Sequence, residues 1–198
     1  MLLESNRDDI ERHLKLLIDP WHDKLDAKIE FRAIKKDDRP MWWFSDVDQD
    51  SIESAVDKVV EQNEANRGRN IYVTVNPIKA KVERSAKDED VAAAYYVFAD
   101  ADKQDAVLRL KEASLKPSFF VSTGRVPEAR AHAYWRFEGT TDLDTWKMLQ
   151  KRIQAHFGTD AVTNPSRVLR LAGTITWPDK GKRARGYLPE LTRLVEEF

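Results

Sequence analysis

Two carboxylates separated by one residue are the strongest candidates for chemistry in this sequence. Asp100 and Asp102 end the apolar, aromatic-rich run of residues 95–102. So short an apolar run predicts a strand that is buried on both faces and emerges at its C-terminal end. Because side chains alternate along a strand, the two carboxylates point to the same side, roughly 6 to 7 Å apart. Like charges this close repel unless a cation lies between them, so a divalent metal ion is the expected partner.

Asp160 is the third candidate metal ligand. Hard divalent ions such as Mg²⁺ prefer oxygen donors and accept substrate phosphates as their remaining ligands. An Asp, any residue, Asp pair also occurs by chance on many surfaces, so solvated turn residues are the alternative. The position at the end of an apolar strand favours a function, because a charge there is costly unless it is used or hydrated.

Several polar and basic residues further along the chain could bind phosphate. Ser122 ends a second short apolar strand in a Gly-containing turn, where backbone N–H groups can meet phosphate oxygens. His132 is on the polar face of an alternating strand, where a lone histidine usually has no special function. Residues 165–187 contain a single acidic residue, Asp179, and form a local positive patch, with a solvated loop as the alternative. Its basic residues are Arg167, Arg170, Lys180, Lys182, Arg183 and Arg185.

The composition indicates a globular domain. The 198 residues are 34% charged and 41% hydrophobic, which predicts one domain, or a domain with a small lobe. A net charge of −1 gives no overall attraction to nucleic acid or membrane, so any such contact must come from a local patch. The absence of cysteine excludes a disulfide scaffold and a thiolate nucleophile. With no signal peptide or membrane-spanning run, we expect a cytoplasmic protein without a membrane partner.

Hydrophobic periodicity predicts an α+β fold whose strands are mostly antiparallel, with helices on one face. Helices are expected at residues 6–18, 51–66, 103–114, 142–157 and from Pro189 onward. Strands are expected at residues 27–34, 41–44, 71–75, 95–102, 118–122, 131–137, 168–171 and 174–177. Residues 78–90 are expected to form a mobile surface loop. We expect one domain spanning residues 1–198, with an N-terminal lobe (1–69), a catalytic core (70–190) and a terminal helix (189–198).

Taken in order, these motifs resemble the catalytic domain of the archaeo-eukaryotic primase superfamily, in its plasmid and phage primase-polymerase branch. Residues 97–102 match the family's apolar strand with its acidic pair, and residues 122–135 match its Ser-Gly-type turn and histidine-bearing strand. Asp160 corresponds to the third, acidic motif, and residues 165–174 to an arginine-rich stretch with a Leu-Pro-Gly-Thr-like turn. Two departures are a longer turn before His132 and Ala172 in place of a common proline. The resemblance covers roughly residues 70–190.

The resemblance implies an RNA-recognition-motif-like sheet that carries the acidic site, plus a smaller N-terminal α/β lobe. It also implies template-directed nucleotidyl transfer with two Mg²⁺ or Mn²⁺ ions held by the catalytic residues Asp100, Asp102 and Asp160. The implied nucleotide-binding residues are Ser122, His132, Arg170 and Lys180, and those for nucleic acid are Lys182, Arg183 and Arg185. Arg32 is a further candidate phosphate contact. Expected partners are a single-stranded DNA template and NTPs or dNTPs, and a replicative helicase in the same or another chain is a candidate.

Two other functions are compatible with the same residues. A non-catalytic single-strand-binding or replication-initiator module could use Tyr134, Trp135 and the basic segment, without metal or nucleotide. A metal-dependent nuclease could use the same carboxylates but would release nucleotides.

Overall fold

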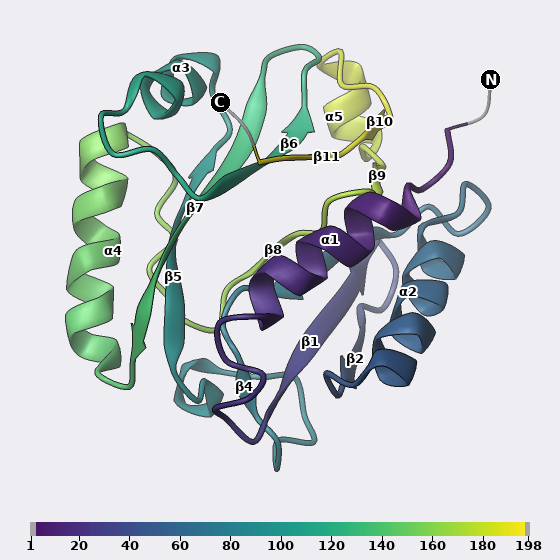
Figure 1. Ribbon diagram of the computed structural model, residues 1–198. Coiled ribbons are helices and arrows are strands. Elements are labelled where there is room, and N and C mark those ends of the chain that lie inside the picture. The colour runs from purple at the N-terminus through teal and green to yellow at the C-terminus, as the bar shows by residue number, and fades with distance from the viewer. Residues whose placement is uncertain (1–2, 197–198) are drawn as a thin grey trace.

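The structure, a computed structural model, describes residues 3–196 and is built on two antiparallel sheets (Figure 1). The helices are α1 (Arg7–Ile18), α2 (Gln49–Asn63), the 3-10 helix η1 (Asp88–Asp90), α3 (Gln104–Glu112), α4 (Leu143–Phe157) and α5 (Lys180–Ala184). The strands are β1 (Ala27–Ile34), β2 (Met41–Ser45), β3 (Asn70–Thr74), β4 (Ile78–Lys79), β5 (Ala94–Ala101), β6 (Phe119–Gly124), β7 (Arg130–Thr140), β8 (Val168–Arg170), β9 (Ile175–Thr176), β10 (Glu190–Leu191) and β11 (Arg193–Val195).

The four longer helices occur where periodicity predicts them, and local side chains cap three of them. The side chains of Asn6, Asp48 and Asp142 accept hydrogen bonds from the backbone N–H groups at the starts of α1, α2 and α4. Gly158 ends α4 in the left-handed conformation, with φ of 62°. Helix α1 begins at Arg7, one residue later than predicted, and α2 begins at Gln49, two residues earlier than predicted.

The sheet that carries the acidic pair has the strand order β11-β6-β7-β5. Although α3 connects β5 to β6, these strands are not neighbours, because β7 lies between them and pairs antiparallel with both. This split β-α-β arrangement is the RNA-recognition-motif-like layout that was predicted. The α+β fold with mostly antiparallel strands is confirmed.

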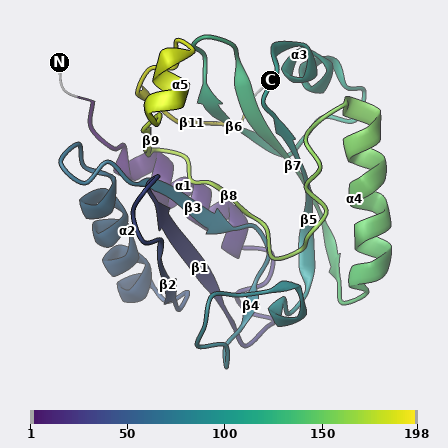
Figure 2. The same cartoon turned by 180° about the vertical axis from the view of Figure 1, so that it is seen from behind.

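The second sheet has the order β2-β1-β3-β8, and β4 pairs with one end of β1 (Figure 2). Strands β3 and β8 lie within the predicted 70–190 core, yet they pair with the sheet that begins in the 1–69 lobe. One hydrophobic core joins the two sheets, because buried residues of β1, β3, β5 and β7 belong to the same cluster.

Helix α4 closes the free edge of β5. Trp146 donates from Nε1 to the Tyr96 carbonyl at 2.8 Å, and the Gln150 amide pairs with both backbone groups of Phe98. An open strand edge would leave its backbone groups without partners, so these bonds protect β5. They also set the path of the chain after α4, which leads to the third carboxylate.

Three sequence predictions about secondary structure are wrong. The helix expected from Pro189 is replaced by β10 and β11, because β9 and β6 offer free edges with which the Leu, Thr and Val residues of this segment pair; residues 197–198 lie outside the described part. The basic loop forms the short helix α5, capped by Asp179. Residues 78–90 form a packed segment around the buried side chains of Ile78, Val82, Ala86 and Val91.

Within residues 3–196, no helix has the length and apolar character needed to cross a membrane.

Candidate active site

Asp100 lies opposite His132 in the pairing of β5 with β7. Residues paired in this way project to the same face of a sheet, and the Asp100 Oδ1 and His132 Nε2 atoms are 3.3 Å apart. Arg167 approaches from the turn before β8, with its Nη2 3.9 Å from Asp100 Oδ2. The carboxylate therefore lies between a histidine of β7 and an arginine from the turn before β8.

The electrostatics of Asp100 favour its ionised form. Burial alone would raise the pKa of Asp100, but the charge and hydrogen bond of His132, followed by the charges of Arg167 and Arg170, outweigh burial. The net effect is a pKa below the ordinary value. An ionised carboxylate is the form that binds a metal ion.

Asp160 is placed beside Asp100 by the backbone. Its N–H donates to the carbonyl of Asp100 at 3.0 Å, which continues the closure of the β5 edge begun by α4. The pKa of Asp160 is raised by burial and then by the charges of Asp100 and Asp102, against the opposing effects of Lys103 and Arg167. The backbone bond thus brings Asp160 to the sheet edge that carries Asp100 and Asp102, whose charges act on it.

The donor set at this edge suits a hard divalent cation. Carboxylate oxygens are the ligands that Mg²⁺ and Mn²⁺ prefer, and a cation would relieve the repulsion that raises the Asp160 pKa. Asp100 and Asp102 both line the main cleft, whereas Asp160 lies next to it. Within residues 3–196, no three Asp, Glu or His side chains are close enough to hold an ion as they stand.

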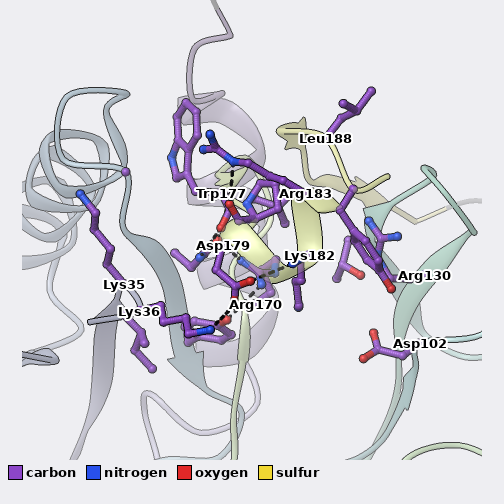
Figure 3. Close-up of a pocket in the computed structure, with 18 of the residues that line it drawn as sticks. Lys35, Lys36, Asp102, Arg130, Arg170, Trp177, Asp179, Lys182, Arg183 and Leu188 are labelled. Atoms are coloured by element: carbon purple, nitrogen blue, oxygen red, sulfur yellow. Dashed lines mark hydrogen bonds and ion pairs between the residues drawn. The ribbon is translucent and has the colours of Figure 1, made fainter. Parts of the chain in front are cut away.

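Asp100 and Asp102 line a cleft of about 1000 Å³ that lies between the two sheets and α5 (Figure 3). Among the described residues, nine Lys and Arg side chains and four Asp side chains line it, so the cleft is positive although the chain has a net charge of −1. Six of the predicted residues line it with the acidic pair: His132, Arg170, Lys180, Lys182, Arg183 and Arg185. Sequence reasoning did not assign four further cations to the site: Lys35, Lys36, Arg130 and Arg167.

Arg170 is held in the cleft wall by residues of β3. Its Nη1 donates to Asn70 Oδ1 at 2.8 Å, its Nη2 donates to the Tyr72 hydroxyl at 3.0 Å, and the guanidinium lies over the Tyr72 ring at 4.8 Å. These contacts fix the orientation of Arg170 while leaving its charge in the cleft.

Arg130 is a nearly buried cation on the other wall. Its Nη2 pairs with Glu190 Oε2 at 3.0 Å, and its guanidinium lies 4.6 Å from the centre of the Tyr187 ring. Glu190 also accepts from the backbone N–H groups of Arg125 and Val126. Gly124 makes room for this pair, because a Cβ there would collide with both side chains.

Ser122 is not brought into the cleft. It pairs with Ala131 on one side and Arg193 on the other, whereas the neighbouring Thr123 lines the cleft. Side chains alternate along a strand, so one step in register decides which residue reaches the site. A register irregularity between Ser122 and Gly124 adds to this difference.

Three other expectations about side-chain positions are wrong. Arg32 is engaged in a structural contact: it donates from Nε to the fully buried Glu30 at 2.8 Å and from Nη2 to the Ala86 carbonyl. His132 is buried, because α1 covers the face of β7 that was expected to be polar. Tyr134 and Trp135 are buried in the core and cannot stack on a bound strand.

The comparisons with known proteins give structural neighbours only, since neither a protein-family model nor a curated protein matches the sequence. The archaeo-eukaryotic primase (AEP) domain of the cyanophage S-2L primase-polymerase is 27% identical, over 97% of this chain and 90% of that chain, with a TM-score of 0.62. The primase RepB' is 15% identical, over 96% of this chain and 56% of that chain, with a TM-score of 0.63. The catalytic domain of RepB' in complex with initiator DNA is 15% identical, over 95% of this chain and 82% of that chain, with a TM-score of 0.61.

These neighbours are a phage primase-polymerase domain and a primase, and their TM-scores show that this chain has a similar fold. In its fold the chain is similar to the archaeo-eukaryotic primase (AEP) domain, which agrees with the resemblance that the sequence motifs predicted.

Proposed function

We propose that this chain is a template-directed nucleotidyltransferase, a DNA primase-polymerase of a plasmid, phage or mobile-element replication system. The observation that carries the proposal is the meeting of Asp100, Asp102 and Asp160 at the end of β5, beside a cleft lined by basic residues. The structural likeness to the cyanophage S-2L primase-polymerase domain supports it.

Asp100, Asp102 and Asp160 would hold Mg²⁺ or Mn²⁺. When bound, such ions activate the attacking 3′-hydroxyl and stabilise the pyrophosphate leaving group. The chain's own cations have a separate task, because a triphosphate carries several negative charges that must be neutralised in the cleft. Arg170, which Asn70 and Tyr72 hold in the cleft wall, would supply such a charge, and His132, 3.3 Å from Asp100, would contact the triphosphate.

Helix α5 and the turn after β1 would contact the DNA. Lys180, Lys182, Arg183 and Arg185 lie on α5 or directly after it. Lys35 and Lys36 follow β1 and also line the cleft, and the Lys36 Nζ lies 3.9 Å from Asp179 Oδ2 at the start of α5. Lys and Arg side chains contribute affinity for nucleic acid through phosphate contacts that do not depend on sequence. The neighbour RepB' was determined with initiator DNA, which supports DNA as the polymer bound by this fold.

The test is primer synthesis and primer extension on single-stranded DNA with NTPs or dNTPs. The double variant Asp100→Ala, Asp102→Ala is expected to lose incorporation by at least about 100-fold, since it removes charge stabilisation at the reacting phosphate. Asp105→Asn is the matched control, because Asp105 is an exposed carboxylate on α3 that does not line the cleft. Incorporation that survives the double substitution would contradict the proposal.

The same assay separates the other two functions. A metal-dependent nuclease would shorten an end-labelled primer, and the double variant would stop the shortening. A non-catalytic binding module would retain DNA in the absence of metal and nucleotide, and the double variant would bind as the wild type does.

A further inference from the structure

Three aromatic rings other than His132 line the cleft in the described part of the chain, and they differ in what lies on them. Tyr72 has the Arg170 guanidinium over its ring at 4.8 Å, and Tyr187 has that of Arg130 at 4.6 Å. Within residues 3–196, no cation or second ring stacks on Trp177. Trp177 is therefore the aromatic side chain in the cleft whose ring is still available for stacking.

The position of Trp177 is held by two asparagines. Asn70 Nδ2 donates to the Trp177 carbonyl at 2.9 Å, and Asn70 Oδ1 accepts from the Trp177 N–H at 2.8 Å. The indole Nε1 donates to the carbonyl of Asn63 at 2.8 Å, and Asn63 itself is fully buried. These bonds hold the ring edge and the backbone, so a ligand that stacks on the ring does not have to order it.

Positive side chains lie on the same side of the cleft as Trp177. Figure 3 shows Lys35 and Lys36 on the side away from Asp102, with Arg170 between them and Asp102. Lys180 at the start of α5 lines the same wall. The side of the cleft away from the carboxylates thus combines an aromatic ring with cations, the pair of features that binds single-stranded nucleic acid.

We propose that Trp177 is a stacking platform for an unpaired nucleobase, with Lys36 and Lys180 contacting the adjacent phosphates. The identity of the polymer as single-stranded DNA rests on the proposed function. Stacking on an aromatic ring accepts every base, because each base has a π-face. A platform of this kind suits a template whose sequence the enzyme must not select.

The first test measures binding of a fluorescent single-stranded oligonucleotide by anisotropy, without metal or nucleotide. Trp177→Leu is expected to weaken binding by roughly 5- to 150-fold, whereas Trp177→Phe should retain most of the affinity. Both variants lose the hydrogen bond to Asn63, so their difference isolates the aromatic ring. Trp177→Leu should leave the salt dependence unchanged, while Lys36→Gln should lower the slope by about one counterion.

A second test compares two oligonucleotides on the wild-type protein, so its main result does not depend on how the variants fold. An oligonucleotide with consecutive abasic sites keeps its phosphates but cannot stack, so it should bind several-fold more weakly than the intact strand. Trp177→Leu should bind the two strands equally. Equal binding of both strands by the wild type, or an equal loss for Leu and Phe, would overturn the platform.

The two proposals can fail separately. Base-dependent binding that requires Trp177, in a protein that incorporates no nucleotide, would support the platform and contradict the polymerase. Metal-dependent incorporation by a protein that does not distinguish abasic from intact strands would support the polymerase and contradict the platform.

Discussion

Asp100 and His132 face each other across β5 and β7, with Oδ1 and Nε2 3.3 Å apart, both largely buried. The pair ties a carboxylate proposed for metal binding to a histidine proposed for phosphate binding. The interaction with His132 therefore contributes to the lowered pKa of Asp100.

Replacing His132 should weaken nucleotide binding more than DNA binding. A hydrogen bond to a charged group contributes about 1.5–3 kcal/mol, so His132→Ala is expected to raise KM for the nucleotide by roughly 10- to 150-fold. His132→Gln keeps a hydrogen-bond donor, so its KM should fall between those of the wild type and His132→Ala. Steady-state extension kinetics measure KM for the nucleotide, and oligonucleotide anisotropy measures the affinity for DNA. An equal loss of both affinities would instead point to general unfolding of the site.

Asp160→Asn should raise the free energy of unfolding and lower nucleotide incorporation. Because the pKa of Asp160 is raised, its ionised form is disfavoured in the fold, and stability is lost as pH rises through the ordinary value and then the raised one. The amide cannot ionise, so urea denaturation at pH 7 in EDTA should show a variant that is more stable than the wild type. The same variant should lose nucleotide incorporation. A less stable variant would show that the Asp160 carboxylate has a structural role.

The buried His13 should make the fold sensitive to acid. Burial and then the charge of His132 lower the pKa of His13 from 6.5 to about 3. As pH falls from about 6.5 toward 3, the unfolded chain takes up a proton that the folded one does not, and stability decreases by up to about 1.4 kcal/mol per pH unit. His13 Nδ1 accepts from the Ala172 N–H, which a glutamine can also do. Urea denaturation from pH 7 to 4 should therefore show a flatter profile for His13→Gln. His22→Gln, at an exposed histidine, should keep the wild-type slope.

Glu190 should stabilise the cleft wall as well as the C-terminal strands. Glu190→Ala leaves the nearly buried Arg130 without its carboxylate and two backbone N–H groups without an acceptor, at a cost of about 3 kcal/mol. Glu190→Gln retains an acceptor and should cost less. Chemical denaturation measures both. Arg130→Met with Glu190→Ala should recover part of the loss, because the uncompensated charge is then absent. No recovery in the double variant would contradict the importance of this ion pair.

Local patterns in the sequence determined the central parts of the site. The apolar run that ends in Asp100 and Asp102 is β5, and period-two alternation placed His132 on a strand that pairs with it. The four longer helices followed from 3.6-residue periodicity. These features depend on neighbours in the chain, so the sequence contains them directly.

The tertiary structure decided what depends on partners far apart in the chain. Strand register decided that Thr123, and not Ser122, lines the cleft. The packing of α1 against β7 buried His132. Closure of the β5 edge brought Asp160 to Asp100, and hydrogen bonds with Asn63 and Asn70 hold Trp177 in the cleft that Lys36 also lines. The C-terminal segment became strands because β6 and β9 had free edges, a long-range pairing that outweighs local preference. The sequence thus determined which groups could do the chemistry, and long-range pairing decided which of them meet.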